Sequence, residues 1–135
     1  MTSSINPQIF REYDIRGIVG TDLTSDSVTK IGKAIGTYIK RGGGKLMVLG
    51  RDVRASSVEF QKILSTALNS TGCDVIDIGM VPTPMTYFAL HHFEADGGVM
   101  ITGSHNPPEF NGFKISQGVY SLYGEQVQKL KQLIQ

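Results

Sequence analysis

Apolar residues recur along the chain with two alternating spacings. From Ser25 to Arg41 they return every third or fourth residue and form one stripe, which a run of three glycines follows. This spacing predicts an amphipathic helix that ends at the glycines. The apolar runs Lys45–Leu49, Cys73–Ile78 and Gly97–Thr102 are too short for a helix, and they predict buried strands.

Two further helices are predicted between these strands. One begins at Ser56, whose side chain is expected to form a reciprocal capping box with Glu59. The other is expected to have Thr83 as its N-cap and Pro84 in its first turn. The apolar spacing after Glu125 predicts a last amphipathic helix at the end of the chain.

The alternation of strands and helices predicts a three-layer α/β/α fold around a four-stranded mixed sheet. The fourth strand is expected at Phe113–Ser116. Only about ten residues separate it from the strand before it, which is the lower limit for a parallel crossover, so the last strand is predicted to be antiparallel. No internal repeat and no linker-like composition appear, and residues 1–135 are therefore expected to form a single domain.

Composition narrows the range of partners. The chain has 135 residues, and 13 Lys and Arg against 12 Asp and Glu give a formal net charge of +1. This balance offers no basic patch for nucleic acid, and no apolar run approaches the ~20 residues of a membrane span. A soluble, cytoplasmic protein is expected. The single cysteine, Cys73, lies in an apolar run and predicts a buried, inert thiol rather than a nucleophile.

Chemistry is expected in the loops that follow the parallel strands, because the carboxyl ends of such strands meet along one edge of a sheet. One loop reads Gly103-Ser104-His105-Asn106 and continues with two prolines. Glycine permits a sharp exit from a strand, and proline fixes φ, so a stiff turn that presents the Ser104 hydroxyl is predicted. An ordinary Asx or serine turn stopped by proline explains the same residues, and spacing alone does not separate the two.

Four segments, in one order, extend the pattern beyond this loop. They are FREYDIRGIVG at 10–20, GRDVR at 50–54, DIGMVPTPMTYFA at 77–89 and ITGSHNPPEFNGFKI at 101–115. Together they resemble the α-D-phosphohexomutases, and the phosphomannomutase/phosphoglucomutase branch looks closest. These enzymes have four domains, and this chain is similar to the first of them only.

The resemblance implies catalytic roles for three residues. Ser104 would carry a phosphoryl group, donate it to a hexose phosphate and recover one from a hexose bisphosphate intermediate. Lys114 would act as a general acid and base, and His105 would lie beside the phosphorylated serine. Without the neighbouring motif, Lys114 would be interpreted as a lysine on an edge strand, where its charge opposes aggregation of the protein through that edge.

The resemblance also implies binding roles for Tyr13, Arg16 and Asn106 at the substrate and at phosphate. Arginine suits this role because its guanidinium can contact phosphate oxygens in a bidentate manner, although a surface ion pair explains Arg16 equally well in isolation. The resemblance implies Mg²⁺ as the cofactor, which would be bound through the phosphate on Ser104 and an aspartate triplet. This chain has no such triplet, so the other metal ligands are expected on a second domain.

Two interpretations follow for the whole chain. In the first, it is the phosphoserine-bearing domain of a phosphohexomutase, inactive alone and active with the remaining domains of the parent enzyme. In the second, it is an isolated α/β domain without activity that serves as an interaction or assembly module. A serine hydrolase is excluded because the residues around Ser104 lack the glycines of a G-x-S-x-G elbow.

Overall fold

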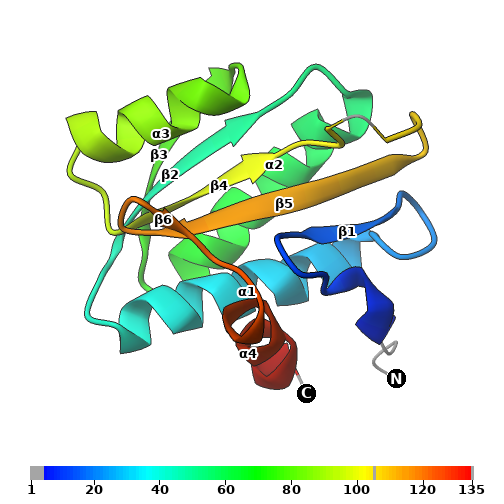
Figure 1. Ribbon diagram of the computed structural model, residues 1–135, viewed down its shortest axis with the longest axis horizontal. Helices are drawn as coiled ribbons and strands as arrows, with labels where there is room; N and C mark the ends of the chain where they lie inside the picture. Colours follow the sequence, from blue (N-terminus) through cyan, green and yellow to red (C-terminus); the bar gives the residue numbers. More distant parts are fainter. Residues whose placement is uncertain (1–4, 105, 135) are drawn as a thin grey trace.

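A computed structural model describes residues 5–104 and 106–134, which form one sheet with helices on both faces (Figure 1). The strands are β1 (Ile15–Ile18), β2 (Leu46–Arg51), β3 (Asp74–Met80), β4 (Gly97–Ile101), β5 (Phe110–Gln117) and β6 (Tyr120–Ser121). The helices are α1 (Ser25–Arg41), α2 (Ala55–Ser70), α3 (Thr83–His92) and α4 (Glu125–Ile134), with a short 3-10 helix, η1 (Pro7–Ile9).

The sheet is mixed, as predicted. Its strand order is β1-β5-β4-β2-β3, and β6 pairs with β5. Strand β2 runs parallel to both β3 and β4, whereas β5 returns antiparallel to β4, which confirms the predicted direction of that strand.

The sheet has six strands in the described residues rather than the predicted four. The two additional strands, β1 and β6, pair antiparallel with β5. Strand β1 reads Ile-Arg-Gly-Ile and β6 has two exposed residues, so neither carries an apolar run of its own. Their strand structure depends on the backbone of β5, which the local sequence does not reveal.

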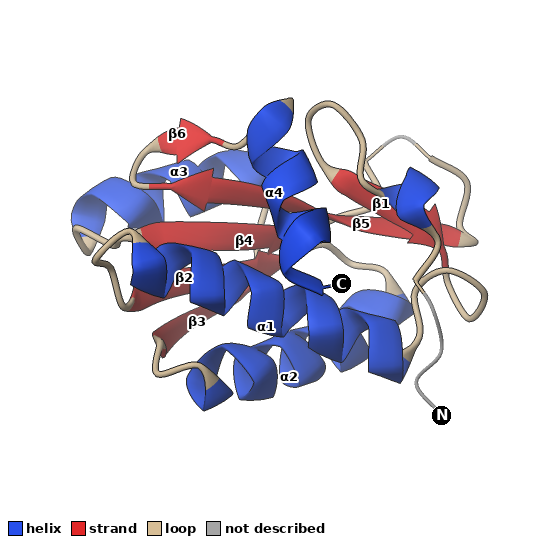
Figure 2. Ribbon diagram, turned by 90° about the horizontal axis from the view of Figure 1, so that it is seen from below, coloured by secondary structure: helices blue, strands red, loops and turns tan. Residues whose placement is uncertain are grey.

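The two faces of the sheet are covered unequally. Helices α1, α2 and α4 pack on one face over the main hydrophobic cluster, which contains Val28, Leu64, Phe113 and Leu130 and also the buried Cys73. Helix α3 packs on the other face over a small cluster around Val48 and Leu90. Figure 2 shows α1, α2 and α4 in front of the sheet and α3 behind it. The predicted three-layer α/β/α class is therefore confirmed.

Helix α1 has the predicted bounds, but two other helices begin differently from the prediction. Helix α2 starts at Ala55, and its N-cap residue, Arg54, makes no side-chain cap. The predicted capping box of Ser56 with Glu59 is wrong, because the Ser56 hydroxyl instead accepts a hydrogen bond from Asn111 Nδ2 at 2.8 Å.

At α3 the N-cap is Pro82, and Thr83 is the first helical residue, so the predicted Thr83 cap is also wrong. Pro84 does lie in the first turn. No helix within the described part of the chain is both long and apolar enough to cross a bilayer.

Candidate functional site

The connection from β4 to β5 forms a tight turn around Ser104 at the carboxyl end of β4. Ser104 is exposed and has a left-handed backbone, with φ of +55°. Its N–H donates to Thr102 Oγ1 at 2.9 Å, and the carbonyl of Gly103 accepts from both the backbone N–H and the side-chain amide of Asn106. A left-handed backbone costs an L-residue about 1–2 kcal/mol, and such conformations concentrate at functional sites.

The Ser104 hydroxyl is therefore presented to solvent. It makes no hydrogen bond with any other residue that the structure describes. A serine oxygen that was buried and permanently hydrogen-bonded could not accept a transferable group. The observed geometry meets the requirement for such an acceptor.

Arg54 holds this turn from the start of α2. Strands β2 and β4 are parallel neighbours, so the β2–α2 connection and the Ser104 turn follow adjacent strand ends (Figure 1). The guanidinium of Arg54 donates to four backbone carbonyls of the turn. These are Pro107 O (2.8 Å) and Phe110 O (2.9 Å) from Nη1, and Asn106 O (2.7 Å) and Ser104 O (3.3 Å) from Nη2.

Asp52 holds the N–H groups of the same region. Its carboxylate accepts from the Ser57 hydroxyl at 2.6 Å, from Gly103 N at 3.0 Å and from Arg54 N at 3.1 Å. Burial raises the pKa of the Asp52 carboxyl, but these hydrogen bonds outweigh burial and hold the pKa below its usual value. Asp52 is therefore a charged anchor between β2, α2 and the turn.

Gly103 is required at its position by close approach. A Cβ placed there would overlap the Nε and Cζ of Arg54. That guanidinium is fixed by its carbonyl partners and by Asp52, so it is not free to move away. A glycine before Ser104 thus permits the contact between Arg54 and the turn.

Arg16, on β1, reaches the turn from the other side. Its Nη1 donates to Asn106 Oδ1 at 3.5 Å, and its Nη2 forms an ion pair with the buried carboxylate of Asp14 at 2.9 Å. The structure thus brings two of the predicted binding residues, Arg16 and Asn106, next to Ser104. Tyr13 lies just before β1 with its ring largely exposed, and no ring contact fixes it within the described residues.

Lys114 lies on β5, farther from Ser104 than the turn residues. Its partner across β4 is Met100, four positions before Ser104, and no hydrogen bond or ion pair joins it to the turn in the part of the chain that the structure describes. Ile15 and Phe113, which pair across β1 and β5, both face the main core. By strand alternation Arg16 and Lys114 therefore share the opposite face. His105 lies outside the described residues.

The residues that the structure describes do not by themselves form a Mg²⁺ site. Residues 5–104 and 106–134 contain no group of three or more His, Cys, Asp or Glu side chains that could hold a metal ion. Asp52 contacts the turn, but its two oxygens are engaged with Ser57, Gly103 and Arg54.

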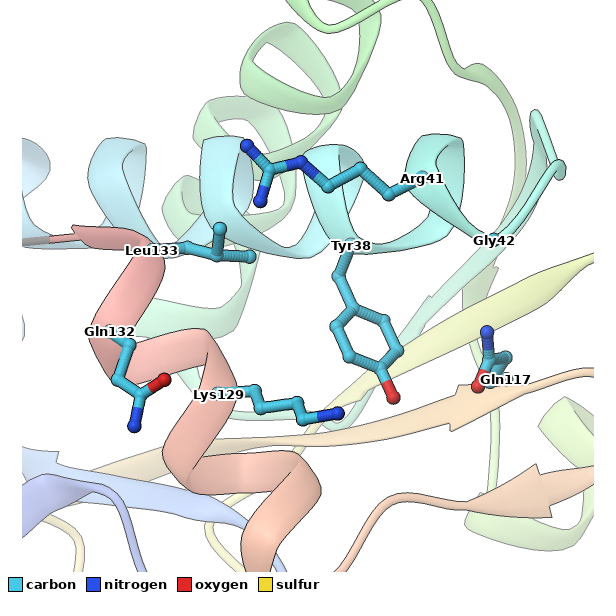
Figure 3. Close-up of a pocket in the computed structure, with 7 residues that line it drawn as sticks. All are labelled: Tyr38, Arg41, Gly42, Gln117, Lys129, Gln132 and Leu133. Carbon is cyan, nitrogen blue, oxygen red and sulfur yellow. The ribbon is translucent and has the colours of Figure 1, made fainter.

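A cavity of about 470 Å³ lies away from this site, between the end of α1 and α4 (Figure 3). Tyr38 and Arg41 of α1 and Lys129 of α4 line it, together with Gln117 of β5. Gln117 pairs with Gly97 at the beginning of β4, whereas Ser104 follows the end of β4. The cavity is therefore at the opposite end of the central strands and does not contribute to the Ser104 turn.

Asp52 and Arg54 have no role in the sequence prediction, although their segment GRDVR contributes to the family resemblance. Both lie about 50 positions before Ser104, so only the pairing of β2 with β4 brings them to the turn. The rule that loops after adjacent parallel strands meet could have suggested them. Asn111 adds a further link, because its buried amide donates to the hydroxyls of Ser56 and Ser57 on α2.

Comparison with known proteins identifies the family of the chain. Residues 7–135 match the family model for phosphoglucomutase/phosphomannomutase, alpha/beta/alpha domain I. The chain is 48% identical over 127 residues to a phosphomannomutase/phosphoglucomutase of Pseudomonas aeruginosa, covering 94% of this chain and 27% of that protein. It is 45% identical over 133 residues to a phosphoglucomutase of Neisseria gonorrhoeae, covering 98% and 29%.

Among solved structures, it is similar to a phosphoglucomutase/phosphomannomutase family protein from Burkholderia thailandensis, with a TM-score of 0.92 and 40% identity over 97% of this chain and 30% of that one. The chain thus spans less than a third of the length of these relatives. Since the family model covers nearly all of its residues, the chain belongs to the α/β/α domain I family of phosphoglucomutases and phosphomannomutases.

Proposed function

We propose that this chain is the phosphoserine-bearing domain of a phosphohexomutase, with Ser104 as the residue that carries the phosphoryl group. The parent enzyme would interconvert hexose 1-phosphates and hexose 6-phosphates through a hexose bisphosphate. The observation that carries the proposal is the exposed Ser104 hydroxyl, on a left-handed turn that is held by hydrogen bonds with Asp52 and Arg54 of the β2–α2 connection.

The proposed reaction has two phosphoryl transfers. In the first, the bond between phosphorus and Ser104 Oγ breaks as a hydroxyl of the hexose phosphate bonds to that phosphorus, which gives the bisphosphate. In the second, the other phosphate of the bisphosphate returns to Ser104 Oγ after the sugar has turned over. Phosphoryl transfer needs positioning and charge neutralisation more than covalent assistance.

Each remaining residue has a proposed role in these steps. Lys114 takes the proton of the attacking hydroxyl and returns one to the leaving oxygen, and His105 assists beside the serine. Arg16 and Asn106 bind phosphate oxygens, which the hydrogen bond between them and their position at the turn support. Tyr13 is exposed and free of ring contacts in the described structure, which suits contact with a substrate.

Mg²⁺ belongs to the same proposal. It would bind an oxygen of the Ser104 phosphate, neutralise charge on that group, and take its other ligands from the remaining domains of the parent enzyme. Those domains, a hexose phosphate and a hexose bisphosphate are the proposed partners, and the cytoplasm is the proposed location. The isolated chain is proposed to lack mutase activity.

The test is phosphopeptide mass spectrometry after incubation with glucose 1,6-bisphosphate and Mg²⁺. The chain is assayed alone and in a hybrid in which it replaces the matching segment of the Pseudomonas aeruginosa relative. We expect phosphate on Ser104 of the hybrid, its loss in Ser104→Ala, and no change in Ser121→Ala, which alters an exposed serine on β6. A hybrid with no phosphate at Ser104 would leave the interaction or assembly module as the better interpretation.

A further inference from the structure

Arg54 directs its guanidinium to partners within the protein. A guanidinium has five N–H groups. Four of them donate to the carbonyls of Ser104, Asn106, Pro107 and Phe110. The Nε atom lies 3.3 Å from the Asp52 carboxylate, in an ion pair. Both terminal nitrogens of Arg54 are therefore occupied by the turn rather than by a phosphate or a substrate.

Arg16 differs from Arg54 in how much of its guanidinium is bonded within the protein. Arg16 makes one long contact, at 3.5 Å, with the turn and one ion pair with Asp14, so part of its guanidinium remains available. The Arg54 side chain is also the less exposed of the two, at 18% against 32%. The two arginines therefore have different roles at the Ser104 turn.

The contacts of Arg54 and Asp52 are complementary in polarity. Arg54 binds the C=O groups of Ser104 and of three later residues, and Asp52 binds the N–H of Gly103. The peptide group between Gly103 and Ser104 is itself bonded to Thr102 Oγ1 and Asn106 Nδ2, so the backbone of Ser104 is held at positive φ from both sides. The direction of the serine side chain follows from that backbone.

We propose that Arg54 is a positioning residue, which sets the direction of the Ser104 hydroxyl by holding the carbonyls of the turn and which does not touch the phosphoryl group. This inference rests on the proposed function of Ser104. It predicts that Arg54 affects the rate of phosphoryl transfer and not the affinity of the enzyme for the sugar phosphate.

The first experiment measures the turn itself, in the 135-residue chain, by backbone NMR. Arg54→Lys keeps the charge but cannot span four carbonyls from one ammonium. We expect the order parameter of Ser104 to fall from about 0.85 to below about 0.6. The couplings and shifts that report positive φ at Ser104 should be lost, while shifts in α4 stay unchanged.

Arg51→Lys is the matched control, since Arg51 is the last residue of β2, three positions before Arg54, but donates to Gln61 and to the carbonyl of Asp52 rather than to the Ser104 turn. It should leave the order parameter of Ser104 as in the unaltered chain. If Arg54→Lys also leaves Ser104 ordered and at positive φ, the inference is wrong. This outcome does not depend on whether Ser104 accepts phosphate.

The second experiment measures phosphorylation of Ser104 by glucose 1,6-bisphosphate in the hybrid enzyme. In the mutase assay of the same hybrid, Arg54→Lys should lower kcat at least tenfold and change the KM for the hexose phosphate less than twofold. Arg54→Ala should regain rate when ethylguanidinium is added, whereas Ser104→Ala should not. A raised KM with an unchanged kcat would mean that Arg54 binds substrate directly and would overturn the inference. Absence of phosphate in the unaltered hybrid would instead contradict the proposed function.

Discussion

At the scale of single residues, Asp52 connects the stability of the domain to pH. Burial favours the protonated form of Asp52, but its hydrogen bonds with Ser57, Gly103 and Arg54 favour the carboxylate more strongly, and the pKa is lowered. A group with a lowered folded pKa stabilises the protein above its unfolded pKa of about 3.9. That contribution is lost as the pH falls through the folded pKa.

We therefore predict that Asp52→Asn lowers the free energy of unfolding at pH 7 and weakens its pH dependence below about pH 4. The amide can accept through one oxygen but presents an NH₂ group to existing donors. Urea unfolding at pH 7 and at pH 3 measures both effects. The difference between variant and unaltered chain should shrink at the lower pH.

Asp74→Asn is the matched control, because Asp74 is exposed and has one lysine partner, Lys45. It should change the unfolding free energy at pH 7 little, as exposed ion pairs usually contribute about 0–1 kcal/mol. Asp22 and Asp96 also have lowered pKa values, so some pH dependence should persist in Asp52→Asn. An equal loss in both variants would contradict the anchor role of Asp52.

The sequence singles out Ser104 because glycine and proline around a serine restrict the local backbone. Arg16 and Asn106 enter through the family resemblance, and the structure brings both to the turn. Asp52 and Arg54 could not be assigned in this way, since residue type alone does not show that an arginine binds backbone carbonyls of a distant turn. Their role comes from strand order, which brings positions about 50 apart into contact.

At the scale of elements, the spacing of apolar residues predicts those helices and strands that depend on the local sequence. The apolar stripe and the glycines give the bounds of α1, and the short apolar runs locate β2, β3 and β4. The start of α2 is not predictable in the same way, because Ser56 and Ser57 bind Asn111 on β5 instead of capping their own helix. Elements that depend on a distant partner, such as β1, are missed for the same reason.

The packing of α1 on α2 gives a prediction at this scale. A Cβ on Gly32 would lie 2.6 Å from Ala67 Cβ and 3.1 Å from Leu64 Cδ2. Alanine is favoured over glycine in a helix by about 1 kcal/mol. Overpacking a core typically costs about 1–3 kcal/mol, and here the contact is with a backbone-fixed Cβ. We expect Gly32→Ala to destabilise the domain in urea unfolding despite the gain in helix propensity.

The double variant Gly32→Ala, Ala67→Gly tests the cause, because it removes the atom that the new methyl group meets. It should be less destabilised than the sum of the two single variants. Lys33→Ala, on the exposed side of the same helix, should have little effect. Stabilisation by Gly32→Ala would mean that α1 and α2 are less closely packed than the structure indicates.

At the scale of the whole molecule, the site occupies one rim of the sheet and is open. Helices α1, α2 and α4 cover one face, and α3 is the one helix of the described residues that packs on the other (Figure 2). By strand alternation, Arg16 and Lys114 lie on the α3 side of the sheet. If Ser104 carries a phosphoryl group, as proposed, water can reach that group at the open rim. The proposed transfer must exclude water, since hydrolysis would remove the phosphoryl group that is to be returned.

We therefore predict that the isolated chain folds cooperatively but interconverts glucose 1-phosphate and glucose 6-phosphate at no measurable rate. The hybrid with the Pseudomonas aeruginosa relative should be active, and Ser104→Ala should abolish that activity. A coupled assay for glucose 6-phosphate, with circular dichroism as the control for folding, gives both results. Water exclusion and metal ligands are expected to come from the remaining domains of the parent enzyme, so turnover by the 135 residues alone would show that the open rim suffices.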